Sequence, residues 1–361
     1  MKIVMLGLCV TSSWGNGHAT TYRSLIKGLA ARGHEVLFLE RDVPWYAQNR
    51  DQPQPAGART ELYEDLGQLF ERYEADVRNA DLTIVGSYVP EGVAVGEWVT
   101  ATARGVRAFY DIDTPVTLEK LASRDREYIT PELVRRYHLY LSFAGGRTLK
   151  IIERRWGSPM ARVLYCSVDT TLYRPCFQQP RWDLGYLGTW SQDRQVWLEE
   201  LLCKPARRWP EGRFSVVGPL YPDGIEWPRN VERITHLSPQ QHARFYGSQR
   251  FTLNITRDAM KRAGYSPSVR LFEAGACGVP IISDWWPGLD TIFTPGREIL
   301  LSSNADDTLR LVRDFSAQDL RRIGEAAMRR VHAEHTPAMR ALQLEQYYEE
   351  ASSALEKAMS A

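Results

Sequence analysis

Apolar runs alternate with amphipathic stretches from the start of the chain. Lys2–Val10 is continuously apolar, and after a loop rich in Ser and Gly the segment Ala19–Arg32 carries apolar side chains at helical spacing. Gly33 ends this helix, and His34–Glu40 has the pattern of a second buried strand. The chain is therefore predicted to open with a β-α-β unit.

The same alternation continues through the rest of the sequence and predicts two parallel sheets. Further strands are expected at Asp81–Gly86, Arg107–Asp111, Leu139–Phe143, Asp183–Gly188, Arg213–Gly218, Phe251–Ile255 and Pro280–Ser283. Each is followed by a loop and a helical stretch, which is typical of a sheet with helices on both faces. The predicted fold class is α/β, with two Rossmann-like, doubly wound domains.

A stretch without periodicity marks the predicted domain boundary. Ser167–Trp182 is rich in proline and polar residues, so we place the linker there and expect domains at 1–168 and 169–336. A length of 361 residues suits two domains. Residues 337–361 contain a last helical stretch, predicted over Pro337–Ala351.

Composition and charge narrow the classes of protein. The chain has 45 Lys plus Arg against 44 Asp plus Glu, which disfavours a broad nucleic-acid-binding surface. Its five cysteines are widely spaced, without a paired zinc-type pattern, and suit a reducing compartment. No apolar stretch reaches the roughly 18 residues of a membrane span, and no signal peptide is visible. These features predict a cytoplasmic protein without a transmembrane segment.

The strongest candidate site lies in the segment Gly264–Asp284. Ser266 is a suitable N-cap and Pro267 suits the first helical position, so a helix is expected to begin there. The backbone N–H groups of Ser268 and Val269 would then be free to bind an anion such as a diphosphate. Upstream, Gly264 and Tyr265 would allow the chain to approach that ligand closely.

Arg270 and Glu273 stand three positions apart on this predicted helix, so their side chains are expected to lie near one another. A carboxylate in this place can accept both hydroxyls of a ribose. The alternative is an ordinary surface ion pair on a capped helix. The predicted strand at Pro280–Ser283 favours the ligand site, because its carboxyl end meets the crevice where open α/β sheets bind ligands.

The second half resembles a known family. The motifs SPSVRLFEAGACGVPIISD, GLDTIF, PGREILL and RVHAEHT, within Asp183–Pro337, are similar to the donor-binding domain of CgeB-like glycosyltransferases, a branch of the retaining GT-B group. The resemblance implies a GT-B architecture, in which two domains face a central cleft and the last helix crosses back to the first domain. It also implies a donor-binding domain at 169–336 and an acceptor-binding domain at 1–168.

The same resemblance suggests roles for single residues. Glu273 matches the glutamate that holds the donor ribose in that group. Tyr265 stands where many retaining relatives have an acidic residue, so backbone groups of Gly264–Ser266 are expected to serve the sugar instead. Ile234–Leu237 resembles the segment that meets the nucleobase, although its His236 also fits a plain loop histidine.

Basic residues near predicted strand ends are candidates for the diphosphate. Arg194 follows Gly188 and Thr189 in the loop after the strand Asp183–Gly188, while Arg257 and Lys261 follow the strand Phe251–Ile255. A site without a metal must take positive charge from such groups when negative charge develops on a leaving group. Each of them also fits a solvated surface charge.

In the first domain, the loop after the first predicted strand reaches the expected cleft through Gly15, Asn16, Gly17 and His18. Gly15 and Gly17 also form part of a dinucleotide fingerprint, with Glu40 at the end of the next strand, where an adenine ribose would be held. The third glycine of that fingerprint is missing, because position 20 is Thr.

A second group in the first domain follows the strand Arg107–Asp111. Asp111 and Asp113 invite a metal interpretation, but they supply only two ligands, and we expect no metal. Asp113 is a candidate base for an acceptor hydroxyl, with helix capping as the alternative. Ser87 and Tyr88 are expected to line the same cleft.

These observations predict a hexosyltransferase of class EC 2.4 that needs no cofactor. Its donor substrate is expected to be a nucleotide-diphosphate sugar, such as a UDP-, GDP- or TDP-sugar. The resemblance implies retention of the anomeric configuration. His18 and Asp113 are the candidate catalytic residues, and the acceptor is a glycan, a lipid-linked sugar or a small metabolite. The near-zero net charge disfavours a modified DNA base. Alternatives are an epimerase or hydrolase of the same fold, an NAD-dependent oxidoreductase, and a non-catalytic nucleotide-sugar sensor.

Overall fold

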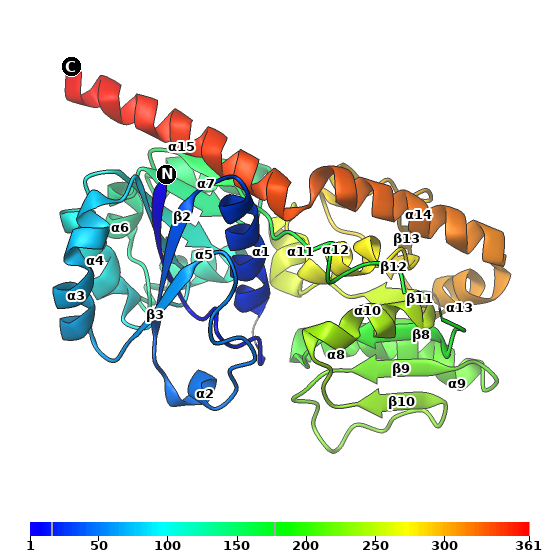
Figure 1. Cartoon of the computed structure of the whole chain (residues 1–361). Coiled ribbons are helices and arrows are strands. Elements are labelled where there is room, and N and C mark those ends of the chain that lie inside the picture. Colours follow the sequence, from blue (N-terminus) through cyan, green and yellow to red (C-terminus); the bar gives the residue numbers. More distant parts are fainter. Residues whose placement is uncertain (16, 177, 361) are drawn as a thin grey trace. The chain divides into compact units, whose positions relative to one another are not determined.

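The computed structural model describes residues 1–15, 17–176 and 178–360. The chain divides into two compact units, which Figure 1 shows with their elements labelled. Unit 1 comprises Met1–Ser167 together with Pro337–Ala361, and unit 2 comprises Val168–Thr336.

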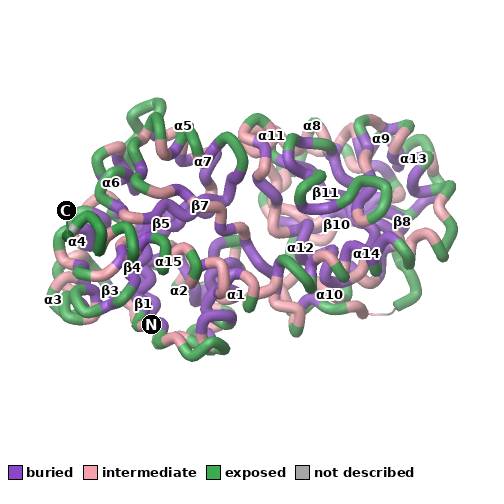
Figure 2. The backbone as a smooth tube through the Cα atoms, turned by 90° about the horizontal axis from the view of Figure 1, so that it is seen from above, coloured by how far each residue is buried: buried purple, intermediate pink, exposed green. Residues whose placement is uncertain are grey.

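Unit 1 is built on a sheet of seven parallel strands in the order β3-β2-β1-β4-β5-β6-β7. Its strands are β1 (Lys2–Gly7), β2 (Glu35–Arg41), β3 (Arg59–Tyr63), β4 (Leu82–Gly86), β5 (Val106–Asp111), β6 (Leu139–Ser142) and β7 (Ala161–Val163). The central strands are almost wholly apolar and buried, as expected of parallel strands covered on both faces. In Figure 2 they are drawn in the colour of buried residues.

The helices of unit 1 lie mainly in the connections between these strands, because a parallel pair needs a long crossover. They are α1 (Gly17–Ala31), α2 (Pro44–Ala47), α3 (Leu66–Asn79), α4 (Gly92–Thr102), α5 (Thr114–Ser123), α6 (Pro131–Arg136), α7 (Arg147–Arg154) and the C-terminal α15 (Pro337–Ser360). Helix α15 packs on α1. It also contacts the segment after β7, because Arg340 Nε donates to Tyr165 O at 2.9 Å.

Unit 2 repeats this plan with six parallel strands in the order β10-β9-β8-β11-β12-β13. Its strands are β8 (Trp182–Leu187), β9 (Phe214–Val217), β10 (Val231–Ile234), β11 (Gln249–Asn254), β12 (Ile281–Ser283) and β13 (Leu300–Leu301). Its helices are α8 (Gln192–Leu198), the π-helical turn η1 (Glu199–Cys203), α9 (Lys204–Arg208), α10 (Pro239–Gly247), α11 (Asp258–Ala263), α12 (Val269–Ala276), the 3₁₀ turn η2 (Leu289–Thr291), α13 (Ala305–Asp314) and α14 (Ala317–Glu334).

The predicted α/β fold class is confirmed, since both sheets are parallel and doubly wound. Sequence patterns did not predict β3, β7, β10 or β13, which lie at or next to the sheet edges and are short or partly exposed. The first strand ends at Gly7 rather than Val10, because the following backbone turns away to contact a buried carboxylate. The last helix runs nine residues beyond the predicted Ala351.

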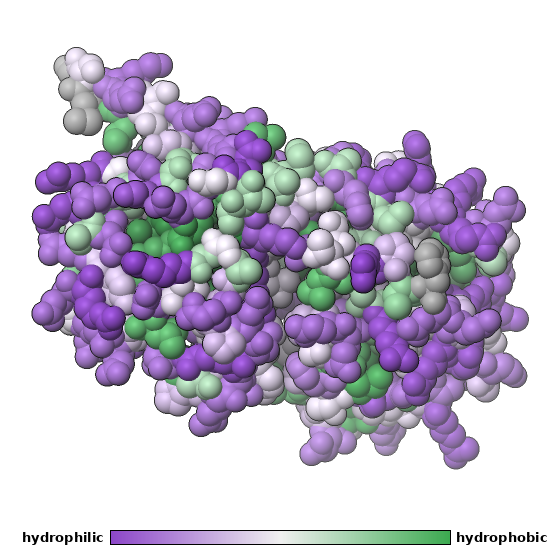
Figure 3. Space-filling view, viewed as in Figure 1, coloured by the Kyte–Doolittle hydropathy of each residue, from purple (hydrophilic) through white to green (hydrophobic). Residues whose placement is uncertain are grey.

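The strand order reverses at one point in each sheet, between β1 and β4 in unit 1 and between β8 and β11 in unit 2. Open α/β sheets bind ligands beyond the carboxyl ends of the strands at this position. Within the described part of the chain, none of the helices combines the length and apolarity needed to cross a bilayer. Hydrophilic residues cover most of the face drawn in Figure 3.

Candidate functional site

Three arginines come together beyond the carboxyl ends of β8 and β11 in unit 2. Arg194, in the first turn of α8, donates from Nε to Ser191 Oγ at 2.8 Å and from Nη2 to Thr189 O at 2.6 Å. Burial lowers the pKa of Arg194, and the charges of Arg270 and Arg257 lower it further. The site therefore holds mutually repelling positive charges, an arrangement that favours an anionic ligand.

Arg270 is buried and aimed at the end of β8. Its Nη1 donates to Asn254 Oδ1 at 2.9 Å, its Nε donates to Leu187 O, and its guanidinium lies 4.8 Å from the ring centroid of Tyr186. Nη2 makes no hydrogen bond to any described residue, and a Cβ on Gly188 would lie 2.6 Å from it. Because Gly188 has no side chain, its backbone can lie close to the Arg270 guanidinium.

The two other predicted cations differ from one another. Arg257 is 46% exposed and lies 3.9 Å from Asp193 Oδ2. Lys261 Nζ contacts the buried Asp284 Oδ2 at 2.6 Å and lies 3.8 Å from the ring centroid of Trp197. Because Asp284 neutralises the ammonium group, the structure does not favour the predicted role of Lys261 in holding a diphosphate.

Helix α12 begins later than the sequence predicted. Its N-cap is Ser268 and its first residue is Val269, so the expected cap at Ser266 with Pro267 in the first turn is wrong. Ser268 Oγ donates to Asn254 Oδ1 at 2.8 Å and does not cap the helix. The first amides of α12 therefore lack a side-chain cap and remain suited to an anion.

The loop before α12 is held in an unusual backbone conformation, which explains this shift. Gly264 has φ +70° and Tyr265 has φ +50°, and Tyr265 N donates to Pro287 O at 2.6 Å. This bond holds the loop against the turn at Gly288, where a Cβ would lie 2.4 Å from the Tyr265 ring. Ser266 is buried at the end of this loop.

Glu273 is 6% exposed on α12, and its Oε2 accepts a hydrogen bond from Tyr246 Oη at 3.3 Å. No ion pair or hydrogen bond joins it to Arg270 within the described residues. The alternative of a surface ion pair is therefore wrong, since both side chains are buried and turn to different partners. His236 lies in the loop after β10, where it is exposed.

In unit 1, a second group of predicted residues lies beyond the carboxyl ends of β4 and β5. His18 is 7% exposed, its Nε2 lies 3.3 Å from Asp113 Oδ2, and its Nδ1 is buried without a hydrogen-bond partner in the described chain. Tyr88 has φ +61°, and its ring centroid lies 5.8 Å from that of His18. Ser87 Oγ accepts from Ile112 N at 3.1 Å, so Ser87 supports the backbone.

Asp111 is fully buried and is not exposed to a ligand. It accepts hydrogen bonds from Thr117 Oγ1 at 2.6 Å and from Tyr140 Oη at 2.5 Å. Burial raises the pKa of Asp111 to about 6, although these two hydrogen bonds oppose the shift. Asp111 and Asp113 thus have different surroundings, and the described residues contain no group of three or more metal-binding side chains.

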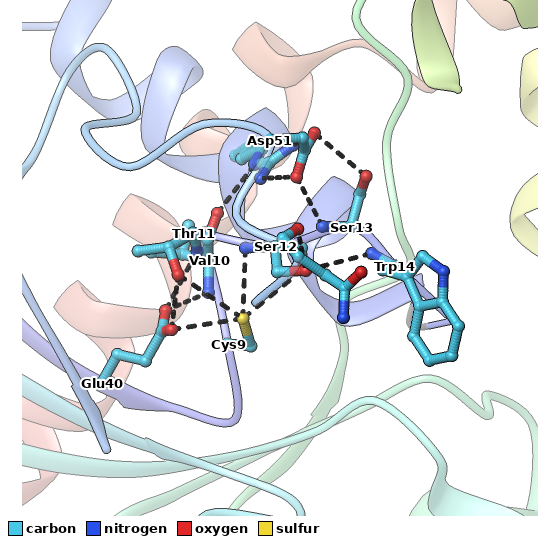
Figure 4. Close-up of polar contacts among 10 residues, drawn as sticks. Cys9, Val10, Thr11, Ser12, Ser13, Trp14, Glu40 and Asp51 are labelled. Carbon is cyan, nitrogen blue, oxygen red and sulfur yellow. Dashed lines mark hydrogen bonds and ion pairs between the residues drawn. The ribbon is translucent and has the colours of Figure 1, made fainter. Parts of the chain in front are cut away.

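Glu40 has an internal role that the sequence did not reveal (Figure 4). Its carboxylate accepts from Val10 N at 2.6 Å, from Thr11 N at 3.0 Å, from Thr11 Oγ1 at 2.6 Å and from Cys9 Sγ at 3.3 Å. Both oxygens are saturated and fully buried. The predicted alternative in which Glu40 holds the ribose of a dinucleotide is therefore wrong.

The same loop is fixed from its other side by Asp51, as Figure 4 also shows. Asp51 accepts from Ser13 N at 2.7 Å and forms a two-pronged ion pair with Arg23. The chain then continues to Gly15, with φ +65°, and to Gly17, the first residue of α1. Asn16, which was predicted to line the cleft, lies outside the described residues.

Several neighbours of the candidate site were missed from the sequence. Asn254, which contacts both Arg270 and Ser268, had a detectable signal, because it is a polar residue in a strand of apolar ones. Tyr246 and Tyr186 had none, since aromatic residues are usual in a core.

The chain is similar to known proteins in part of its sequence and in its fold. Residues 194–346 match a protein family described as glycosyl transferase-like. None of the curated proteins compared with the chain matches it in sequence. This match covers part of unit 2 and the start of α15, and solved structures share the GT-B architecture predicted for the whole chain.

Individual solved structures share this fold over nearly the whole chain. Sucrose-phosphate synthase from Thermosynechococcus elongatus is 16% identical, with a TM-score of 0.68 over 98% of this chain and 100% of that one. HepE from Anabaena, in complex with UDP-glucose, is 14% identical, with a TM-score of 0.69 over 96% and 99%. An alpha-glucosyltransferase in complex with UDP-glucose and DNA is 13% identical, with a TM-score of 0.71 over 96% and 98%.

Proposed function

We propose that this protein transfers a hexosyl group from a nucleotide-diphosphate sugar to an acceptor hydroxyl, with retention of the anomeric configuration. The observation that carries the proposal is the combination of Arg194, Arg257 and Arg270 with the uncapped start of α12 at one sheet edge of unit 2. The buried carboxylate of Glu273 stands on the same helix. Retention, and membership of the CgeB-like branch, are supported by the sequence motifs of the second half.

The arginines supply what the transfer needs on the donor side. When the bond between the anomeric carbon and the diphosphate breaks, negative charge grows on the leaving nucleoside diphosphate. Arg194 and Arg270 are held by backbone carbonyls and side chains before any ligand arrives, so little reorganisation is required. Helix amides at Val269 and Arg270 would add partial positive charge. Glu273 would hold the ribose, and Gly188, Thr189 and Gly264–Ser266 would pass close to the donor.

Known structures with this fold indicate which donor to test first. HepE and the alpha-glucosyltransferase were both solved with UDP-glucose. A UDP-sugar is therefore our first candidate donor.

On the acceptor side, we assign the proton transfer to unit 1. The new bond forms between the anomeric carbon and the acceptor oxygen, whose proton must pass to a base. Asp113 is our candidate for this base, because its carboxylate is 42% exposed and is held by His18. A glycan, a lipid-linked sugar or a small metabolite would provide the hydroxyl.

A thermal-shift screen tests the donor site. UDP, GDP, TDP and their sugars are added to the wild type, to Glu273→Ala and to the control Glu211→Ala, which removes an exposed carboxylate of unit 2. We expect at least one nucleotide to raise the Tm of the wild type and the control. Glu273→Ala should weaken that binding by roughly tenfold or more, as expected for the loss of hydrogen bonds to a charged group. If no nucleotide stabilises the protein, or if the substitution changes nothing, the donor site is wrong.

Turnover assays on the same proteins separate transfer from related reactions. Release of nucleoside diphosphate from the stabilising donor is measured with and without candidate acceptors. A transferase needs the acceptor, whereas a hydrolase or an epimerase consumes the donor alone. His18→Ala should lower turnover while leaving nucleotide binding unchanged.

A further inference from the structure

Two buried phenols flank the carboxylate of Glu273. Tyr246, at the end of α10, is fully buried and donates its hydroxyl to Glu273 Oε2. Tyr173 is also buried, and its hydroxyl lies 3.1 Å from His242 Nδ1. Burial first, and then the negative charge of Glu273, raise the pKa of both phenols well above the usual value. Both therefore stay neutral and keep the proton that a donor needs.

The carboxylate of Glu273 is held by phenol hydroxyls. Oε2 receives the Tyr246 hydroxyl at 3.3 Å, and the Tyr173 hydroxyl is a second hydrogen-bond partner of the carboxylate. A buried carboxylate oxygen is normally satisfied by a partner. Glu40 illustrates this rule, because the chain itself saturates its two oxygens. Glu273 receives fewer donors from the chain than the four that Glu40 receives, so its carboxylate keeps lone pairs for a ligand that brings hydroxyls.

We propose that Tyr246 is a positioning residue, which fixes the Glu273 carboxylate so that the site selects ribonucleoside over 2′-deoxyribonucleoside diphosphates. This inference rests on the proposed function. A ribose presents two neighbouring hydroxyls, one for each oxygen of the oriented carboxylate. A 2′-deoxyribose presents one, which leaves a buried oxygen without a partner, and sites of this kind reject such analogues.

Consequently, UDP- and GDP-sugars are the donors that this site fits, and TDP-sugars are not. Without the Tyr246 hydroxyl, the carboxylate could rotate and the difference between the two sugars would shrink. Binding of a 2′-deoxy nucleotide, which does not use the second hydroxyl, should change little.

Calorimetric titration of the full chain with UDP and 2′-deoxy-UDP tests this inference, with GDP and 2′-deoxy-GDP as a second pair. The variants are Tyr246→Phe, Glu273→Gln and the double substitution. Tyr63→Phe is the control, since it removes a buried hydroxyl in unit 1 that has no partner in the described structure.

We expect the wild type and Tyr63→Phe to prefer the ribonucleotide by about tenfold or more, as for a charged hydrogen bond lost in a buried site. Tyr246→Phe should reduce this preference by about fivefold, and Glu273→Gln should remove most of it. In the Glu273→Gln background, Tyr246→Phe should have no further effect, because the tyrosine acts through the carboxylate.

The outcomes separate this inference from the proposed function. If Tyr246→Phe keeps the wild-type preference, or weakens both nucleotides equally, the positioning role is wrong while the donor site stands. If Glu273→Gln binds UDP and GDP as tightly as the wild type does, the donor site itself is wrong. Should Tyr246→Phe fail to fold, Tyr246→His retains a ring donor, and it should preserve part of the preference if the role is correct.

Discussion

Three buried carboxylates of this protein differ in how their charge is accommodated. Glu40 is saturated by backbone and side-chain donors of its own unit, which gives it a structural role. Glu273 has only phenol hydroxyls as donors, from Tyr246 and Tyr173, and fewer of them than Glu40 has, which suits a ligand. Asp111 accepts hydrogen bonds from two side chains, and burial raises its pKa to about 6. Residue type alone therefore does not distinguish the three.

The raised pKa of Asp111 has a consequence for stability. Its ordinary pKa is 3.8, so the folded chain holds this proton more tightly than the unfolded chain. The resulting contribution to stability is fully present below the ordinary pKa and is lost as the pH rises through about 6. We expect Asp111→Asn, which cannot ionise, to gain about 2 kcal/mol relative to the wild type between about pH 4 and pH 7.

Thermal melts of both proteins across this pH range measure the effect. Asp223→Asn, which alters an exposed carboxylate of unit 2, serves as the control and should follow the wild type. A difference between Asp111→Asn and the wild type that does not change with pH would show that Asp111 does not titrate there.

At the level of elements, α1 and α15 of unit 1 pack against each other, although more than 300 positions separate them in the sequence. A Cβ on Gly28 would lie 2.1 Å from Pro337 O and 3.2 Å from Ala341 Cβ. Arg32 and His34, just beyond α1, both contact Glu345 on α15. The absence of a side chain at Gly28 thus allows the two helices to approach.

Gly28→Ala is therefore expected to destabilise unit 1 by about 2 kcal/mol, a typical cost of overpacking. Gly17→Ala is the matched control on the same helix, because a Cβ there meets no atom within 4 Å. Urea unfolding, followed by the fluorescence of the wild type and both variants, measures the change. Equal stability of the two variants would mean that α15 shifts at little cost.

At the level of the whole chain, the two units differ in continuity. Unit 2 is one uninterrupted segment with its own sheet and core, whereas unit 1 needs Pro337–Ala361 from the far end. Inside unit 1, Arg340 is buried against the carbonyls of Tyr165 and Cys166. A fragment that contains unit 2 therefore needs one segment of the chain, whereas a fragment that contains unit 1 needs two.

We expect the fragment 168–336 to fold alone and to bind the nucleotide that stabilises the full chain. The fragment 1–167, which lacks α15, should melt at a lower temperature than the same fragment supplied with residues 337–361 through a linker. Circular dichroism melts and calorimetry check both expectations. A disordered 168–336 fragment would show that unit 2 depends on unit 1.

Prediction from sequence succeeded best where a pattern is local and repeated. The strands around Ile84 and Leu253 were predicted because a buried parallel strand is apolar along its whole length. The edge strand at Arg59–Tyr63 was missed, because its partly exposed positions lack that pattern. The start of α12 was misplaced, because a bond between Tyr265 N and Pro287 O decides it.

Periodicity and motifs close in the chain were enough to predict the α/β class, the approximate position of most strands, and the segment around Glu273 as a candidate site. Which charges remain available for a ligand depends instead on contacts that form when the chain folds. Lys261 forms an ion pair with Asp284, and Glu40 accepts hydrogen bonds from the loop after β1. The Arg270 guanidinium lies beside Gly188. Each of these contacts joins residues that the fold brings together from distant positions, and local patterns carry no information about such pairs.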